Sequence, residues 1–140
     1  MAKYNIHHIC GHVERVDIVG TNVHGERDRK VARLESDKCR DCKRSEHDAD
    51  NIAAASRNRA QGYAALEGSD RQVAWAESIR SEVIGKARES LDNHRYADVP
   101  KEQFDIASRT IDWMAAITSS AWWIEHQGTA TAVAIRTVSQ

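Results

Sequence analysis

Cys39-Arg40-Asp41-Cys42 and the earlier Cys10-Gly11-His12 are the two segments that organise the amino-terminal part of this chain. The two stretches contain all three cysteines. A C-x-x-C pair can place both sulfurs in one coordination sphere with bonds of about 2.3 Å, the length that Zn²⁺ prefers. Cys10 would supply a third thiolate. The spacing therefore predicts a zinc site that fixes an otherwise polar amino-terminal segment.

The fourth ligand of this site is an imidazole, and the sequence offers more than one. His12 lies two residues from Cys10, so in an extended chain both side chains share one face. His7 is the alternative, and His8 or a water molecule is a third. Four protein ligands favour a closed structural zinc site, since a catalytic zinc keeps one position open. A redox-active C-x-x-C is disfavoured because no strand-helix-strand pattern surrounds it.

The residues around Cys10 predict a β-hairpin. Residues 3–9 and 13–19 read as short strands, and Val16 and Ile18 alternate with Asp17. Gly11 can adopt the positive φ that a hairpin tip often needs. We therefore expect the tip at residues 10–12.

The rest of the chain predicts helices over residues 26–36, 39–61 and 69–91. Ser69 and Gln72 form a capping box at the start of the third. Its buried stripe is expected at near-fourfold spacing, formed by Trp75, Ile79, Val83 and Leu91. After a connection over residues 92–100, an apolar seam from Phe104 to Ile117 predicts a fourth helix, which Pro100 begins.

Thr118, Ser119 and Ser120 can end that helix and cap a short one through Gln127, which Gly128 ends. Residues 129–140 are compatible with a strand, a helix or a mobile tail. The predicted fold class is mostly α with a small β-hairpin: a zinc-ribbon-like head followed by three to four helices. The expected domains are the head over residues 1–44, a helical core over 45–128 and a tail over 129–140.

Composition describes an ordinary soluble protein of 140 residues, with 41% hydrophobic and 29% charged residues and a net charge of −1. Glu26 to Glu46 contains eight basic and six acidic residues, an excess of +2. Nucleic-acid binding is therefore the alternative function and not the preferred one, because dedicated nucleic-acid-binding domains carry a stronger basic bias. The alternative would use Arg27, Arg29, Lys30, Arg33, Arg40, Lys43 and Arg44.

The expected location is the cytoplasm. The first residues lack the apolar segment of a secretory signal, and no apolar run reaches the ~18 residues of a membrane span. An odd number of cysteines, two of them in a C-x-x-C pair, suits metal binding in a reducing compartment. We therefore expect no membrane partner.

No catalytic residue is predicted, because the G-x-S-x-G, P-loop, G-x-G-x-x-G and H-E-x-x-H motifs are all missing. Trp122 and Trp123 are the candidate partner-binding residues. Adjacent helical side chains point about 100° apart, so both rings cannot easily face one core. One ring is expected at the surface or between subunits, where Trp is a favoured anchor.

Several segments resemble small zinc-ribbon-headed proteins that bacterial phages and plasmids carry. The resemblance rests on Cys-Gly-His, Gly25–Arg29 with Leu34–Ser36, C-x-x-C, Gly68–Glu77 and Ala121–Glu125, and spans residues 4–127. It matches Cys10, His12, Cys39 and Cys42 to the ligands. It implies a mobile-element accessory protein without a particular activity. We therefore expect a non-enzymatic, zinc-stabilised binding protein that engages a host protein or a small signalling ligand, in an anti-defence role, with homo-oligomers as a further expectation.

Overall fold

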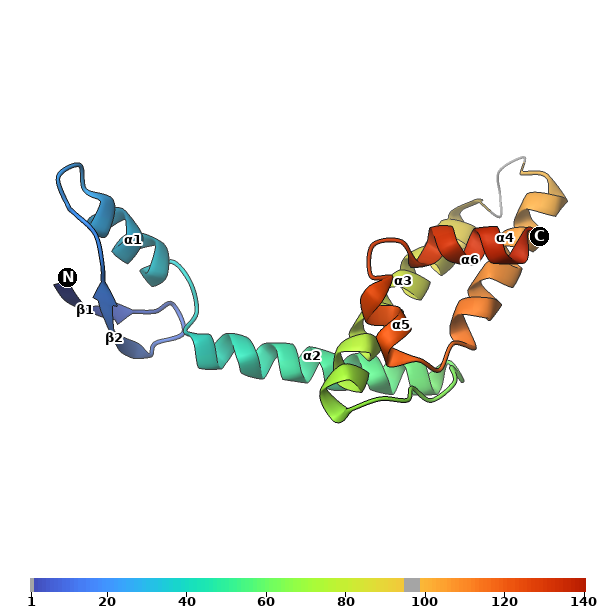
Figure 1. Cartoon of the computed structure of the whole chain (residues 1–140), viewed down its shortest axis with the longest axis horizontal. Helices are drawn as coiled ribbons and strands as arrows, with labels where there is room; N and C mark the ends of the chain where they lie inside the picture. Colours follow the sequence, from blue (N-terminus) through green and yellow to red (C-terminus); the bar gives the residue numbers. More distant parts are fainter. Residues whose placement is uncertain (1, 95–98) are drawn as a thin grey trace. The chain divides into compact units, whose positions relative to one another are not determined.

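The computed structural model describes residues 2–94 and 99–140, and it is mostly helical with an antiparallel hairpin at the amino terminus, as predicted (Figure 1). The predicted connection over residues 92–100 includes residues 95–98, which lie outside the described residues. Among the residues that are described, no helix is both long and apolar enough to cross a membrane. The elements are β1 (Ala2–His7), β2 (Val13–Ile18), α1 (Glu26–Glu35), α2 (Arg40–Ala60), α3 (Asp70–His94), α4 (Lys101–Ala115), α5 (Ser120–Glu125) and α6 (Ala130–Val138).

The chain divides into two compact units, Met1–Asp48 and Ala49–Gln140. The first holds the hairpin, α1 and the beginning of α2, and the second holds the rest of α2 and α3–α6. The boundary therefore falls inside α2 rather than in a loop.

In the first unit, β1 and β2 pair antiparallel with Ala2 opposite Ile18 and His7 opposite Val13. A three-residue loop closes the hairpin, because Gly11 donates to the carbonyl of His8 at 2.9 Å and His8 donates to the carbonyl of His12 at 3.0 Å. Gly11 has φ +85°, the left-handed conformation that this kind of loop requires at its third position. Residues 9–11 are therefore held in a tight and well-defined turn.

The two faces of the hairpin differ. Ile6 and Ile18 share one face and are fully buried, and α1 packs against β1. On the opposite face, Val13, Arg15 and Asp17 are exposed. This period-two alternation is typical of a sheet with a single covered face.

In the second unit, α3 contacts α4, α5 and α6, and α4 contacts α6. These helices enclose a core of small and large apolar side chains, which is typical of helix-on-helix packing. The buried members are Ala76, Ile79, Ile84, Ile111, Met114, Trp123, Ala130 and Ala134. Residues 130–138, for which strand, helix and tail were all open, therefore form a helix that contributes to the core.

The predicted caps are present. The backbone N–H of Gln72 donates to Oγ of Ser69 at 3.3 Å, and Oε1 of Gln72 accepts from the backbone N–H of Ser69 at 3.2 Å. These reciprocal bonds are those of a capping box. Ser119 caps α5 by accepting from the N–H of Trp122 at 3.2 Å.

The predicted buried stripe of α3 is wrong at Trp75, whose side chain is 43% exposed. The neighbouring Ala76 is fully buried instead, and Ile84 replaces Trp75 among the large core residues. Each residue of a helix turns by about 100°, so Trp75 lies at the edge of the face that Ala76 and Ile79 share. The hydrophobic periodicity predicted that the larger residue, Trp75, is buried. Close packing in the core instead buries the smaller Ala76.

A polar cluster is buried beside this core. Arg80 is 1% exposed and donates from Nη2 to Oε2 of Glu77 at 2.9 Å and from Nη1 to the carbonyl of Ala64. Asn58 of α2 donates from Nδ2 to the carbonyl of Glu77 at 2.9 Å. The second half of α2 is therefore joined to α3 by hydrogen bonds to buried groups, in addition to apolar packing.

Candidate metal centre

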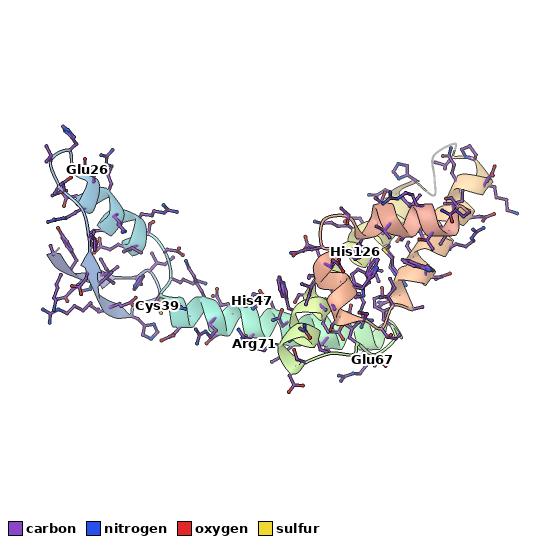
Figure 2. All side chains as sticks on the ribbon, viewed as in Figure 1. Glu26, Cys39, His47, Glu67, Arg71 and His126 are labelled. Carbon is purple, nitrogen blue, oxygen red and sulfur yellow. The ribbon has the colours of Figure 1, made fainter. Side chains whose placement is uncertain are left out.

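Cys39 stands at the start of α2, where Figure 2 labels it. Its carbonyl accepts from the N–H of Lys43 at 3.1 Å, and its Sγ accepts from the N–H of Cys42 at 3.4 Å. This is the arrangement of a helix N-cap with sulfur in place of oxygen. The C-x-x-C spacing thus places Cys42 one helical turn further on, on the same side of α2.

Cys10 belongs to the hairpin loop, 29 residues earlier in the chain. The backbone N–H of Cys39 donates to its Sγ at 3.3 Å. Because Gly11 fixes the turn, Cys10 and His12 are held on either side of it, close to the start of α2. The hairpin tip and the first turn of α2 thus supply two cysteine-containing segments to one site.

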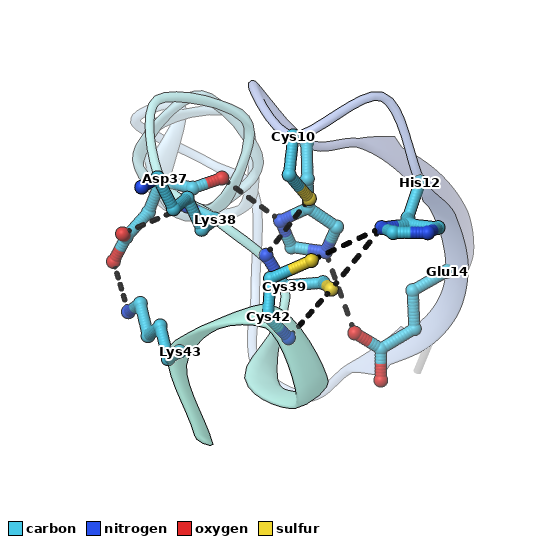
Figure 3. A network of polar contacts seen from close by, with 9 residues as sticks. Cys10, His12, Glu14, Asp37, Lys38, Cys39, Cys42 and Lys43 are labelled. Atoms are coloured by element: carbon cyan, nitrogen blue, oxygen red, sulfur yellow. Dashed lines mark hydrogen bonds and ion pairs between the residues drawn. The ribbon is translucent and has the colours of Figure 1, made fainter. Parts of the chain in front are cut away.

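The four predicted ligands lie together (Figure 3). One ligand atom from each of Cys10, His12, Cys39 and Cys42 lies within 4.8 Å of the other three. Nδ1 of His12 is 3.6 Å from Sγ of Cys39 and 3.3 Å from Sγ of Cys42. A tetrahedral zinc with bonds of about 2.3 Å would separate its ligand atoms by roughly 3.8 Å, so the cluster is compatible with a metal site.

The two other histidines near the site lie outside the cluster. His7 is exposed in β1, opposite Val13. His8 is buried, with Nδ1 3.1 Å from the carbonyl of Asp37 and Nε2 3.4 Å from Oε2 of Glu14. The geometry therefore places His12 in the cluster and leaves His7 and His8 out of it.

His8 holds the loop against the segment that leads into α2, a role that sequence reasoning missed. The carbonyl of Asp37 lies 3.1 Å from Nδ1 of His8 and accepts from the N–H of Ile9 at 3.3 Å. Both contacts fix the chain two residues before Cys39. The signal for this role was the period-two pattern, because a strand that buries Ile6 also directs His8 toward the same face.

The sulfurs of the cluster differ in acidity. The pKa of Cys10 is lowered to about 6, first because the backbone N–H of Cys39 donates to its sulfur and then because the N–H of His12 does. The pKa of Cys42 is raised to about 11, mainly by the contact with the side chain of Cys39, and further by burial and by Cys10. A thiolate at one cysteine of the cluster is thus favoured. A second thiolate would be repelled by the first unless a cation lay between them.

Acidic and basic side chains pair around the cluster. Lys43 pairs with Asp37, which lowers the pKa of that carboxyl, and Lys38 pairs with Glu46, which raises the pKa of that amine. Both pairs are exposed to solvent. They offset the local positive charge beside the site.

The seven basic residues named for nucleic-acid binding all lie in the first unit, but several are engaged locally. Arg27 donates from Nε to the carbonyl of Gly20 at 2.7 Å, and Arg29 donates to the carbonyl of His24 at 3.0 Å. Lys43 pairs with an acid. The remaining ones, exposed on α1 and α2, are Lys30, Arg33, Arg40 and Arg44. Nucleic-acid binding therefore stays the alternative function, and these contacts add no support for it.

The two candidate partner-binding tryptophans have different surroundings. Trp123 is fully buried in the core of the second unit, so the prediction that it binds a partner is wrong. Trp122 is half-buried, with edge-to-face contacts to Trp113 and Trp123 at centroid distances of 5.7 Å and 5.1 Å. Its ring stacks on His126 at 4.5 Å. Only Trp122 retains exposed area for a partner.

A cavity in the second unit was not predicted from the sequence. It has a volume of about 790 Å³ and is lined mainly by apolar side chains of α3, α4 and α6. That volume lies in the range of small-molecule sites. Its apolar lining includes Val83, Leu91, Phe104, Ile111 and Ile135. No sequence motif marks it, because it is made by packing between helices rather than by a local pattern.

The resemblance to zinc-ribbon-headed proteins of phages and plasmids stays a prediction. The chain matches no protein-family model, no curated protein and no solved structure. The interpretation of the site therefore rests on its own geometry.

Proposed function

We propose that this chain binds one zinc ion through Cys10, His12, Cys39 and Cys42, and that the ion has a structural role. The observation that carries the proposal is that these four ligand atoms, from two segments far apart in the sequence, lie within 4.8 Å of one another. Zinc is favoured over harder cations because thiolates and imidazole are soft ligands, whereas Mg²⁺ and Ca²⁺ prefer oxygen.

The ligand set supports a structural rather than catalytic ion. Four protein ligands complete a tetrahedron and leave no position for water or substrate. Metal binding would then contribute directly to folding, because the unfolded chain has no preformed site. The ion would hold the hairpin tip on the first turn of α2.

The test is metal analysis of the protein purified without added metal, followed by replacement of zinc with cobalt. We expect one zinc per chain, and a cobalt spectrum with thiolate-to-metal charge transfer and four-coordinate d–d bands. Protein without stoichiometric metal, which also fails to take up zinc after reduction, would contradict the proposal. A five-coordinate spectrum with bound water would contradict the structural role and support a catalytic one.

The wider role that we propose is that of a non-enzymatic binding protein of a phage or other mobile element. It would engage a host protein or a small signalling ligand and so act against host defence. The resemblance in the sequence supports the mobile-element origin, and the apolar cavity supports the ligand. This lining suits a small, largely apolar molecule better than a phosphate-rich nucleotide, which would require several basic groups.

Thermal unfolding with added probes tests the ligand. Medium-chain fatty acids represent apolar ligands, and cyclic dinucleotides represent phosphate-rich ones. We expect the apolar probes to raise the unfolding temperature of the wild type, and Ala107→Leu, which fills part of the cavity, to reduce the effect. An equal shift in the variant would place binding elsewhere. A shift with the nucleotides alone would contradict the apolar assignment.

A further inference from the structure

The outer edge of β2 carries backbone groups that face away from β1. The closing pair of the hairpin is His8 with His12, so alternation along the antiparallel pair directs the N–H and C=O groups of Glu14, Val16 and Ile18 toward β1. Those of the intervening residues face away from β1. The outward-facing residues within β2 are Val13, Arg15 and Asp17.

Nothing in the described part of the chain pairs with this edge. The sheet has two strands, and among residues 2–94 and 99–140 the outward groups of β2 make no hydrogen bond. Two large apolar side chains flank the edge: Val13 is 57% exposed, and Val19, which follows β2, is 71% exposed. An open edge beside exposed apolar side chains is a template for pairing with another strand.

The sequence of this edge is complementary to itself. When two copies pair antiparallel about a two-fold axis, an outward-facing residue must lie opposite an outward-facing residue. One register places Arg15 opposite Arg15 and another places Asp17 opposite Asp17, and like charges directly opposite one another are destabilising. The register between them places Arg15 of each copy opposite Asp17 of the other.

That same register also brings the exposed valines together. It places Val13 of each copy opposite Val19 of the other, and Val16 opposite Val16 across the axis. It gives a longer overlap than either like-charge register. Of the three registers, the one with Arg15 opposite Asp17 is therefore favoured by the charges, by the exposed valines and by the direction of the backbone groups.

The outer edge of β1 lacks this complementarity. Its outward-facing residues are Lys3, Asn5 and His7, among which there is no acid to face a base. Lysine on an edge strand is a common device against strand pairing. The two edges of the hairpin are therefore not equivalent.

We propose that two copies of this chain associate through β2, forming a continuous four-stranded antiparallel sheet with two reciprocal Arg15–Asp17 pairs. The inference goes beyond the proposed zinc function and requires only that the hairpin is folded. Its symmetric interface is of the isologous kind common in homodimers.

Charge reversal and sedimentation analysis over a range of concentrations test the proposal. We expect the wild type to dimerise as concentration rises. Arg15→Asp or Asp17→Arg alone should weaken association by about tenfold or more, because each turns both attractive pairs into repulsive ones. The double variant Arg15→Asp/Asp17→Arg should recover association. Both side chains are exposed, and circular dichroism verifies that the variants are folded.

Mixing the two single variants provides the sharper experiment. A chain with Arg15→Asp carries acids at both positions, and a chain with Asp17→Arg carries bases at both. Each should stay monomeric alone, and the mixture should form heterodimers. A wild type that is monomeric at the highest soluble concentration, single variants that dimerise like the wild type, or a mixture that stays monomeric would each overturn the proposal.

Measuring zinc in the same samples separates this inference from the proposed function. A monomer with one zinc per chain would overturn the strand pairing and leave the metal site intact. A dimer that holds no zinc and takes none up after reduction would overturn the metal site and support the strand pairing.

Discussion

The backbone N–H of Cys39 donates a 3.3 Å hydrogen bond to Sγ of Cys10, across 29 positions of the sequence. The bond joins the hairpin loop to the N-terminal end of α2 and favours a thiolate at Cys10. Substitution can therefore show which side chains are ligands of the site, and alkylation rates can show which of its cysteines is a thiolate.

His12→Ala should weaken zinc binding by at least tenfold, because it removes one of four ligands. His7→Ala is the matched control, since His7 lies outside the cluster and its substitution should leave affinity unchanged. Competition with a chromophoric zinc chelator measures both affinities. Loss of affinity in His7→Ala with retention in His12→Ala would reverse the ligand assignment.

In the metal-free, reduced protein, Cys10 should react with iodoacetamide at pH values where Cys42 does not. The pKa of Cys10 lies at about 6 and that of Cys42 at about 11, and the thiolate is the nucleophile. Mass spectrometry of peptides after short pulses at several pH values gives the rate at each cysteine. Equal rates at neutral pH would contradict the different environments of the two sulfurs.

The same pKa shift sets the direction of a pH effect on stability. The pKa of Cys10 is lower in the folded protein than the ordinary thiol value of 9.0, so its thiolate stabilises the fold. This stabilisation is fully present above pH 9 and is lost as pH falls through about 6. Urea unfolding of metal-free wild type and Cys10→Ser should differ in pH dependence within this window.

Glu77→Ala should lower the free energy of unfolding of the second unit by about 3–5 kcal/mol, because it leaves the buried guanidinium of Arg80 without its acid. The control is Glu82→Ala, which removes a solvent-exposed pair with Lys86 and should change the free energy of unfolding far less. Chemical unfolding measures both. Similar small costs would show that water reaches Arg80.

Gly68→Ala should lower the free energy of unfolding by about 2 kcal/mol or more. Gly68 has φ +147°, and an added Cβ would lie 2.1 Å from Oγ of Ser120, which already donates to the carbonyl of Glu67. Gly85→Ala in α3 is the control, because a Cβ there meets nothing within 4 Å. It should stabilise the protein by about 0.5–1 kcal/mol. Equal effects of the two substitutions would contradict the close approach at Gly68.

The hairpin, the helices and the metal cluster could be predicted because their signals are local. Gly11 and the flanking alternation fix the turn, and C-x-x-C at a helix start fixes two sulfurs on one side of that helix. Only the approach of Cys10 to Cys39 is long-range, and the chemistry of thiolates suggested it. The choice of His12 over His7 needed the register of the hairpin, which the three-residue loop determines.

The helical core could be predicted less fully, because periodicity cannot tell which of two adjacent apolar residues is buried. Packing against the other helices determines this. Trp75 and Ala76 both fit an apolar stripe, and only the assembled core shows that the alanine is buried. Arg80 and Glu77 read as surface charges, although the two pair with each other inside the protein. The cavity between α3, α4 and α6 depends on how the helices diverge, which no short pattern encodes.

The three-residue turn at residues 9–11 has a consequence for how sequences of this kind can vary in length. An inserted residue there would change the conformation of the turn and move the Cys10 side chain relative to His12, so the turn tolerates no change of length. The segment 19–25 between β2 and α1 holds none of the four ligands, and additions there leave both ends of the site in place. Relatives should therefore keep the interval from Cys10 to His12 fixed while the interval from His12 to Cys39 lengthens and shortens.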